Sequence, residues 1–314
     1  MLAGDIVVTL PAMPTATMPG RLLRLQRLLL VWYRDSARDL PWRRTRDPYR
    51  ILVSEMMLQQ TQAARVAPVY ETFLRRFPTV HALAAATPGE VLIAWQGLGY
   101  NRRAVSLHRA ARAVVAVHGG VVPSALPELL ALPGIGQYTA RAVATFAFHE
   151  RVGPVDTNIG RVLARAVMGA PLSRTAAQAL ADDVVPASGA RGDVADWSQA
   201  LMDLGARTCT ARAPRCDACP IAATCAWLAA GGARALPDPA ATTATRARPQ
   251  AVFAGSDRYH RGRLVDALRW GPVAVDDLCS ACGLDDTQRL VRITNALVDD
   301  GLVEWSEGQL RLPA

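Results

Sequence analysis

Four cysteines close to residue 220 constrain this chain more than any other sequence feature. Cys209, Cys216, Cys219 and Cys225 lie within 17 residues, separated by gaps of six, two and five residues. Because the loops between them are short, four thiolates can point inward and surround one metal centre. Zinc sites usually pair two Cys-x-x-Cys knuckles across a longer gap, whereas this segment has one knuckle flanked by two single cysteines. The segment predicts a metal centre and leaves zinc open as its occupant.

The composition is that of a soluble protein with a polyanionic partner. The 314 residues suffice for about two domains, and the net charge of +8 suits a phosphate backbone. No apolar run approaches the roughly 18 residues of a membrane span. The first 20 residues contain three prolines and no basic leader, which predicts a disordered tail, not a signal peptide. We therefore expect a cytoplasmic protein with no membrane partner and with reduced cysteines.

The basic side chains are all of one kind. The sequence contains no lysine, so each of its 35 basic residues is an arginine. A guanidinium binds phosphate well, but it does not lose its proton and cannot form a Schiff base. Any mechanism that needs a side-chain amine as nucleophile is excluded.

Most of the chain before the cysteines is predicted to be helical, without strand signals. Apolar residues recur at helical spacing over 22–31, 50–69 as one helix, 78–118 as two or three helices, 126–148 as helix–turn–helix, 158–167, 174–185 and 195–204. We therefore expect an all-α fold for this part of the chain.

The turn Leu132–Gly136 is a candidate phosphate site. Pro133 ends one helix, and Gly134 and Gly136 permit positive φ and a close backbone approach. The next helix begins near Gln137, and its first N–H groups point outward, where they can bind an anion. The alternative is an ordinary turn between two helices.

Two carboxylates are candidates for chemistry. Glu55 lies in a nearly apolar helix, where desolvation raises the pKa of a carboxyl group toward neutrality, as a general acid requires. The alternative is that Glu55 faces solvent. Asp156 directly precedes a helix that carries Arg161 and Arg165. Asp156 can cap this helix, and a helix N-terminus keeps a carboxylate ionised.

These motifs resemble the helix-hairpin-helix superfamily of DNA glycosylases, which includes endonuclease III and the adenine glycosylases. The cysteine spacing resembles the [4Fe–4S] loop of that superfamily, and residues 132–143 resemble its hairpin. Residues 54–61, SEMMLQQT, resemble the signature of the adenine glycosylase (MutY) family; endonuclease III-type relatives have no acidic residue at the position of Glu55. The resemblance covers Leu22 to Trp227 and implies a two-lobed, all-α fold with one [4Fe–4S] cluster on the four cysteines.

The resemblance also implies roles for single residues. Glu55 would protonate adenine and Asp156 would stabilise the cationic sugar. Tyr138 replaces the Schiff-base lysine of endonuclease III-like enzymes, which predicts a glycosylase without lyase activity. Gln60 would fill the space left by the extruded base, and Tyr100 would wedge beside the opposing lesion. Four further residues are implied to line the adenine pocket: Trp42, Arg43, Leu58 and Gln199. For each of them the alternative is core packing or a position on a solvated face.

The resemblance and the composition together divide the chain. We expect a disordered tail over 1–20 and a glycosylase core over 21–227, with a six-helix barrel lobe at about 46–153 and an iron–sulfur lobe made of the N-terminal helix and 154–227. An Ala- and Pro-rich linker over 228–251 precedes a winged-helix-like module over 252–314. Its predicted elements are helices over 261–270, 275–282 and 286–300 and a strand–turn–strand over 302–312. Shortened actinobacterial-type adenine glycosylases end similarly and have no Nudix-like domain.

Two further sequence features concern single residues. Asn101 follows Tyr100 where many relatives have a second aromatic residue. Cys279 and Cys282 form a lone C-x-x-C on a predicted helix and are expected to be small core residues, not ligands.

The sequence thus predicts a monofunctional base excision repair glycosylase that hydrolyses adenine paired with 8-oxoguanine or guanine. We expect it to act on mismatched double-stranded DNA as a monomer associated with the nucleoid, without a nucleotide cofactor. One alternative is a thymine or uracil mismatch glycosylase of the same superfamily. The other is a non-catalytic iron–sulfur regulator that binds DNA through its winged helix.

Overall fold

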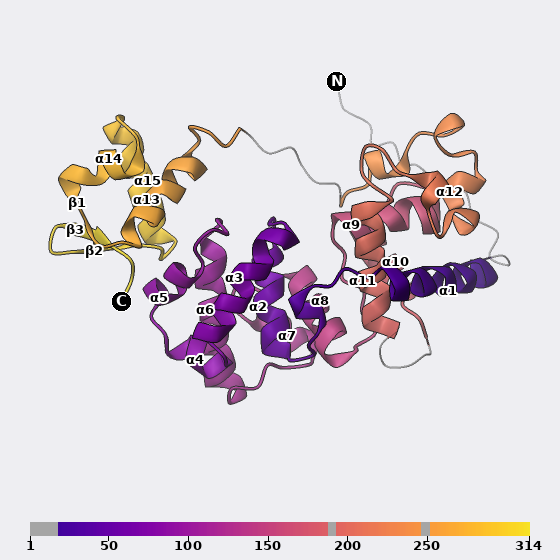
Figure 1. Ribbon diagram of the computed structural model, residues 1–314, viewed down its shortest axis with the longest axis horizontal. Coiled ribbons are helices and arrows are strands. Elements are labelled where there is room, and N and C mark those ends of the chain that lie inside the picture. The colour runs from indigo at the N-terminus through magenta and orange to yellow at the C-terminus, as the bar shows by residue number, and fades with distance from the viewer. Residues whose placement is uncertain (1–17, 188–192, 246–251) are drawn as a thin grey trace, which may run out of the picture. The chain divides into compact units, whose positions relative to one another are not determined.

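A computed structural model describes residues 18–187, 193–245 and 252–314 of the chain, and these fall into two units (Figure 1). The first unit takes the described residues of Met1–Ala37, Thr157–Gly189 and Asp196–Arg246. The second takes those of Arg38–Asp156, Ala190–Ala195 and Ala247–Ala314. In the described ranges, no helix has the length and apolar character needed to cross a membrane.

The second unit is built around a buried central helix, α2 (Pro48–Leu58). Asp47 begins this helix by accepting hydrogen bonds from the first free N–H groups, and Pro48 fits the first turn because it needs no donor there. Tyr49 and every residue from Ile51 to Met57 are buried, whereas Arg50 is exposed. Six helices complete this part of the unit: α3 (Ala63–Arg76), α4 (Val80–Ala85), α5 (Pro88–Ala94), α6 (Arg102–His118), α7 (Leu126–Ala131) and α8 (Gln137–Phe148). Of these, α3, α6 and α8 pack against α2.

The prediction of one helix over 50–69 is wrong, because the chain breaks between α2 and α3. Gln59 leaves the helical region with ψ 114°, and Gln60 has φ 55°, a left-handed conformation that interrupts a helix. The carbonyl groups at the end of α2 are bound by the guanidinium of Arg103, which comes from α6. The end of α2 is therefore stabilised by a cation that is distant in the sequence. The apolar periodicity did not reveal this helix end.

The predicted helix–turn–helix over 126–148 is confirmed by α7 and α8. Gly134 adopts φ 75°, and a Cβ added there would stand 2.5 Å from the Cβ of Ser106. Gly136 differs from the expectation of positive φ: it has φ −92° and is the N-cap of α8. Only Gly134 therefore needs to be glycine for the fold of the turn.

The first unit is also helical. It contains α1 (Met18–Ser36), α9 (Thr157–Val162), α10 (Arg174–Asp183), α11 (Asp193–Arg207, in large part) and α12 (Ala226–Ala229). Helix α1 begins at Met18, inside the tail predicted for residues 1–20; residues 1–17 lie outside the described residues. Between α9 and α10 the chain forms a π-helical turn, η2 (Leu163–Met168). π-helical turns are rare in proteins, and many of those that occur lie at functional sites.

Part of the predicted linker over 228–251 is packed in the first unit. It forms two 3-10 turns, η5 (Gly232–Arg234) and η6 (Pro239–Ala241). The Thr243 hydroxyl accepts a hydrogen bond from the Leu172 N–H, and the Ala244 N–H donates to the Leu172 carbonyl. Composition predicted a linker because helical periodicity is absent, yet tertiary hydrogen bonds hold residues 238–245 in place. Residues 246–251 lie outside the described residues.

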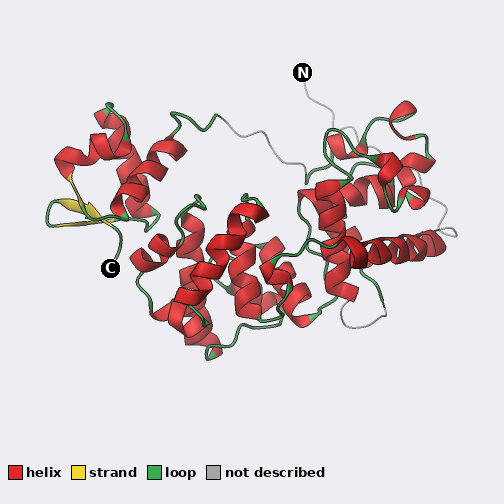
Figure 2. Cartoon of the chain, viewed as in Figure 1, coloured by secondary structure: helices red, strands yellow, loops and turns green. Residues whose placement is uncertain are grey.

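The C-terminal segment of the second unit has the order of elements of a winged helix. Its helices are α13 (Asp257–Leu268), α14 (Leu278–Cys282) and α15 (Thr287–Asp299). Strands β1 (Val273–Ala274), β2 (Glu304–Ser306) and β3 (Gln309–Arg311) form an antiparallel sheet in the order β1-β3-β2 (Figure 2). The hairpin was predicted, whereas β1 has two residues, too few for a period-two pattern. Cys282 is buried and Cys279 is half-buried, in keeping with the predicted packing role.

Candidate active site and metal centre

Glu55 is a buried carboxyl group at the second unit's central helix. It lies on α2 and is 4% exposed. Burial raises the pKa of Glu55 to about 7; a hydrogen bond from Tyr138 lowers it, Asp156 raises it and Arg43 lowers it. One oxygen, Oε2, has no hydrogen-bond partner among the described residues. A buried carboxyl oxygen without a partner favours the protonated form, so Glu55 is suited to hold a proton near neutral pH.

Tyr138 and Asp156 complete a three-residue cluster with Glu55. Tyr138 is the second residue of α8, and its hydroxyl is hydrogen bonded to the carboxyl group of Glu55. Burial, Glu55 and Asp156 together raise the pKa of Tyr138 well above its usual value, so the phenol stays protonated and can donate a hydrogen bond to the Glu55 carboxyl group. Asp156 directly precedes α9 and is half-buried. The structure thus brings the three predicted catalytic residues close enough to affect one another's ionisation.

The four residues predicted to line the adenine pocket have different surroundings. Trp42 is buried and packs edge-on against Tyr70, with ring centroids 5.6 Å apart. Arg43 is close enough to Glu55 to lower the pKa of its carboxyl group. Leu58 is half-buried at the end of α2. Gln199 belongs to the first unit, where its Oε1 accepts a hydrogen bond of 2.5 Å from Tyr33.

Gln60 and Tyr100 share an unusual backbone conformation. Gln60 has φ 55° and Tyr100 has φ 46°, and both side chains are exposed. Residues other than glycine seldom adopt positive φ, at a cost of about 1–3 kcal/mol each, and such strain clusters at functional sites. The two residues predicted to contact the distorted duplex are therefore both held in strained turns.

Arg103 stabilises the backbone beside the candidate site and was missed by the sequence analysis. Its buried guanidinium donates to the carbonyl groups of Met56 and Met57 at 3.0 and 2.8 Å and to that of Gly99 at 3.0 Å. It also donates to the Gln59 carbonyl, and it stacks 5.5 Å from the Tyr100 ring centroid. Burial lowers the pKa of Arg103 to about 10. One cation therefore braces both strained turns, and no local pattern could have revealed a contact across 47 residues.

The helix-hairpin-helix turn offers free backbone donors. Gly136 precedes α8 without any side-chain cap, and a Cβ added there would meet no atom within 4 Å. The backbone is thus open to solvent at Gly136, and no side chain caps the first N–H groups of α8. A helix N-terminus with this exposure binds anions such as phosphate.

The four predicted cysteine ligands line one small cavity in the first unit. The cavity is otherwise mostly apolar, with Leu204, Ile221 and Trp227 among its walls. Burial raises the pKa of Cys219 to about 11, the Ile221 N–H lowers it, and the other three cysteines raise it again. The thiols are thus close enough for the charge of one to change the pKa of another. In the ranges that the structure describes, no group of three or more His, Cys, Asp or Glu side chains has an arrangement that holds a metal ion.

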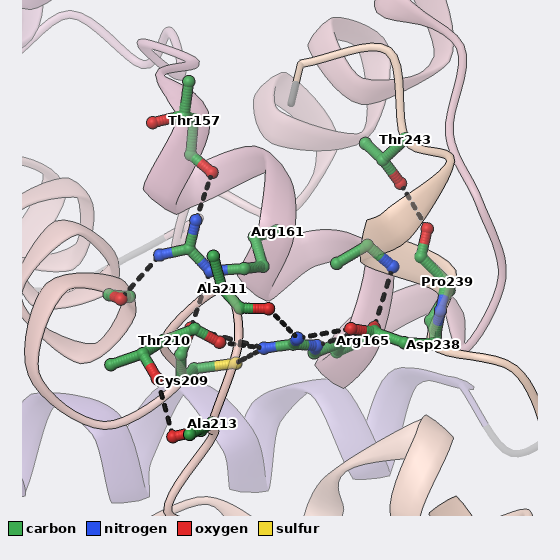
Figure 3. A network of polar contacts seen from close by, with 12 residues as sticks. Thr157, Arg161, Arg165, Cys209, Thr210, Ala211, Ala213, Asp238, Pro239 and Thr243 are labelled. Atoms are coloured by element: carbon green, nitrogen blue, oxygen red, sulfur yellow. Dashed lines mark hydrogen bonds and ion pairs between the residues drawn. The ribbon is translucent and has the colours of Figure 1, made fainter. Parts of the chain in front are cut away.

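Two arginines one turn apart hold the first cysteine (Figure 3). Arg161 donates to the Cys209 carbonyl at 2.7 Å and to Asn158 Oδ1 at 2.8 Å. Arg165 donates to the Cys209 Sγ at 3.3 Å and to the Thr210 carbonyl at 2.7 Å. The two guanidinium groups thus fix the positions of both the backbone and the sulfur of Cys209.

The cavity fits an iron–sulfur cluster by the donors that it presents. Four thiols line it, and Arg165 donates a hydrogen bond to the sulfur of one of them. The indole N–H of Trp227 is buried at the cavity wall and, counting only the residues described, has no acceptor. A buried N–H without an acceptor costs free energy, and cluster sulfurs can accept such hydrogen bonds. The residues present are thus compatible with a sulfur-rich inorganic group.

The fold and these residues define a class of DNA repair protein. The sequence pattern of the HhH-GPD superfamily base excision DNA repair proteins matches residues 53–185, which include Glu55, Tyr138 and Asp156. Adenine DNA glycosylase of Mycolicibacterium smegmatis is 46% identical over 280 residues, covering 88% of this chain and 91% of the relative. Adenine DNA glycosylase of Homo sapiens is 41% identical over 215 residues, covering 63% of this chain and 38% of the relative. The chain belongs to the adenine DNA glycosylase family.

Solved structures agree on the fold. A thermostable thymine-DNA glycosylase has a TM-score of 0.60 at 31% identity, covering 66% of this chain and 96% of that chain. An endonuclease III trapped covalently on DNA has a TM-score of 0.57 at 22% identity, which shows a shared fold alone. The predicted all-α glycosylase fold is confirmed.

Proposed function

We propose that this protein removes adenine from mismatched duplex DNA, opposite 8-oxoguanine or guanine, and leaves the strand intact. The observation that carries the proposal is the Glu55 carboxyl group, which is buried, hydrogen bonded to Tyr138 and adjacent to Asp156. The family membership supports adenine as the base. The choice of 8-oxoguanine or guanine as the opposing base rests on the resemblance of residues 54–61 to the adenine glycosylase signature.

The two carboxyl groups divide the chemistry. Protonated Glu55 donates its proton to a ring nitrogen of adenine, so the glycosidic electron pair leaves with a neutral base. Asp156 stabilises the cationic sugar that remains, as an ion pair or a short-lived covalent adduct. Water then adds its oxygen to the sugar, and its proton returns to the Glu55 carboxylate. The products are free adenine and an abasic site, and the enzyme regains its initial protonation state.

Tyr138 orients the acid and excludes a second reaction. Its hydroxyl donates to Glu55, which leaves Oε2 as the oxygen directed at the substrate. Because Tyr138 stands in place of a Schiff-base lysine and the chain has no lysine, strand cleavage through an imine cannot occur. Borohydride should therefore trap no covalent complex.

DNA binding is proposed to use three parts of the second unit. The N-terminus of α8 binds a backbone phosphate. Gln60 and Tyr100, braced by Arg103, enter the duplex where the adenine leaves it, a step that costs a few kcal/mol and is easiest at a mismatch. A cavity of about 870 Å³ lies beside these two residues and is also lined by Phe253 and Arg258 of the winged-helix segment.

The winged-helix segment is proposed to clamp DNA without forming the adenine pocket. Not all of its arginines are equally available: Arg261 pairs with Asp300, and Arg289 pairs with Asp257 at 2.7 Å. Arg292 is exposed on α15. The substitution Arg292→Ala should flatten the salt dependence of affinity by roughly one unit of slope per lost phosphate contact. Arg289→Ala is the matched control and should change the slope less. An equal effect on 8-oxoguanine and guanine duplexes indicates clamping, whereas a selective effect indicates that the segment reads the lesion.

Cys209, Cys216, Cys219 and Cys225 are proposed to hold one [4Fe–4S] cluster. Their spacing and shared cavity support this assignment, as does the buried Trp227 N–H. When bound, the cluster supplies a rigid, charged cross-link that shapes the surrounding loop. The loop carries Arg212 and Arg215, both exposed, toward a DNA phosphate. Purified protein should be brown with about four irons per chain; colourless protein with stoichiometric zinc would overturn the assignment.

The decisive experiment measures adenine release from an A:8-oxoguanine duplex under single-turnover conditions. Glu55→Gln should bind the duplex and release no adenine, because it lacks the proton. Glu71→Gln, an exposed residue of α3, is the matched control and should behave as the wild type. Release at the wild-type rate by Glu55→Gln refutes the proposal, and loss of binding by that variant leaves the acid unassigned.

A thymine mismatch glycosylase is the second candidate. Tyr138 is found in that subfamily as well, and a thymine-DNA glycosylase is similar in sequence and fold. The same assay on T:G duplexes separates the two: release of thymine faster than adenine would favour the second candidate. Release of neither base, with tight DNA binding retained, would favour a DNA-binding regulator.

A further inference from the structure

The guanidinium of Arg165 joins the cysteine loop to the segment that follows it. Arg165 lies in the π-helical turn η2, and its side chain is 1% exposed. On one side it donates to the Cys209 Sγ at 3.3 Å and to the Thr210 and Ala211 carbonyls at 2.7 and 3.3 Å. On the other side it forms two hydrogen bonds with the Asp238 carboxylate, of 2.8 and 2.5 Å (Figure 3). A single buried cation thus contacts a predicted cluster ligand and a carboxylate 73 residues away.

Asp238 is fixed for this role by its own backbone. Its Oδ1 also accepts a hydrogen bond from the Ala240 N–H at 3.0 Å, at the start of η6. The Thr243 hydroxyl donates to the Pro239 carbonyl at 2.8 Å, which closes the next turn. Burial raises the pKa of Asp238, but hydrogen bonds from Arg165 and Ala240 outweigh it and hold that pKa below its usual value. The carboxylate therefore stays ionised opposite the guanidinium.

We propose that Arg165 and Asp238 form a charged latch that ties residues 238–245 to the cysteine loop and sets the charge next to Cys209. Arg165 and Asp238 act through the ligand, as positioning residues, and neither touches the substrate. The guanidinium favours the more negative, reduced form of a cluster, and the carboxylate offsets that preference. The inference rests on the proposed [4Fe–4S] cluster.

Opposite shifts in reduction potential are the signature of this latch. Asp238→Asn keeps the shape of the side chain but leaves the guanidinium uncompensated, so the midpoint potential of the cluster should rise. Arg165→Gln removes the cation and should lower the midpoint potential. Arg165→Lys retains the charge but not the forked geometry, and should shift the potential less than Arg165→Gln does.

The latch should also protect the cluster from loss. Breaking an outer contact of a metal ligand typically costs about 10–100-fold in metal affinity. Asp238→Asn should therefore release iron to a chelator on the order of tenfold faster than the wild type. Asp217→Asn is the matched control: it removes a carboxylate from within the cysteine loop, but Asp217 is exposed and its charge is screened by solvent.

The experiment is protein-film voltammetry of the full-length, cluster-loaded protein, together with chelator-driven iron release. Opposite shifts for Asp238→Asn and Arg165→Gln, with little change for Asp217→Asn, support the latch. Shifts of the same sign, or an equal shift for Asp217→Asn, overturn it. If Arg165→Gln does not retain iron, Asp238→Asn and Arg165→Lys still decide the question, because unchanged potential and unchanged iron release in both refute the latch. Wild-type protein without iron would instead refute the cluster assignment on which the latch depends.

Discussion

Glu55→Gln should gain stability relative to the wild type as the pH rises from 5 to 8, although it removes the catalytic proton. In the unfolded chain the carboxyl group has its ordinary pKa of 4.5, whereas burial raises the pKa of Glu55 to about 7 in the folded protein. Below pH 4.5 the group is protonated in both states. As the pH rises from 4.5 to about 7, the unfolded chain ionises while the folded protein keeps its proton, so the free energy of unfolding falls.

The size of the effect follows from the two pKa values. A difference of one in pKa corresponds to about 1.4 kcal/mol, so burial of Glu55 should cost the wild type about 3 kcal/mol once the pH exceeds 7. Glutamine does not titrate and carries no such loss. Burying the glutamine amide at this position also lowers the free energy of unfolding, because the amide needs new hydrogen-bond partners. That loss is the same at every pH. The difference in unfolding free energy between variant and wild type should therefore move by most of this amount, in favour of the variant, between pH 5 and pH 8.

Urea unfolding at pH 5 and pH 8 tests this expectation, with tryptophan fluorescence as the readout. Comparison of variant and wild type at each pH removes the contribution of all other titrating groups. Glu71→Gln, which changes an exposed glutamate, should show the same difference from the wild type at both pH values. If the Glu55→Gln difference is also independent of pH, Glu55 is not a buried group of raised pKa and the proton-donor reasoning fails.

Three further outcomes are expected. The single-turnover rate of adenine release should fall about tenfold for each pH unit above about 7, because only protonated Glu55 donates; a rate that stays level up to pH 9 argues against this. Gly134→Ala should lower stability by about 1–3 kcal/mol, since φ is 75° and the new Cβ meets Ser106 at 2.5 Å. Gly136→Ala has open space and is its control; equal unfolding midpoints for the two variants contradict the argument. Arg103→Met should cost about 3 kcal/mol, because several buried carbonyl groups lose their donor. The same variant should slow base release more than it weakens DNA binding, and a variant that unfolds and reacts like the wild type would show that the brace is dispensable.

Local patterns in the sequence determined the parts of this protein that depend on neighbouring residues. The spacing of the four cysteines needs only short loops, and the apolar run around Glu55 favours a buried helix face for that residue. The Leu132–Gly136 turn follows from the conformations that proline and glycine allow. Helix–turn–helix, hairpin and buried acid could therefore be predicted, because each is decided within about one or two turns of helix.

Tertiary structure alone decided the features that join distant residues. The break between α2 and α3 depends on Arg103, which binds carbonyl groups 46 and 47 residues earlier. The hydrogen bond between Tyr138 and Glu55 joins α8 to α2. It forms only because those two helices pack together, so the sequence alone could not predict it. Residues 238–245 look like a linker by composition, yet Arg165 holds them from 73 residues away. A buried charge needs a partner because leaving it unpaired away from water costs much free energy. The fold supplies that partner from any distance along the chain, so the local sequence pattern predicts neither its position nor its identity.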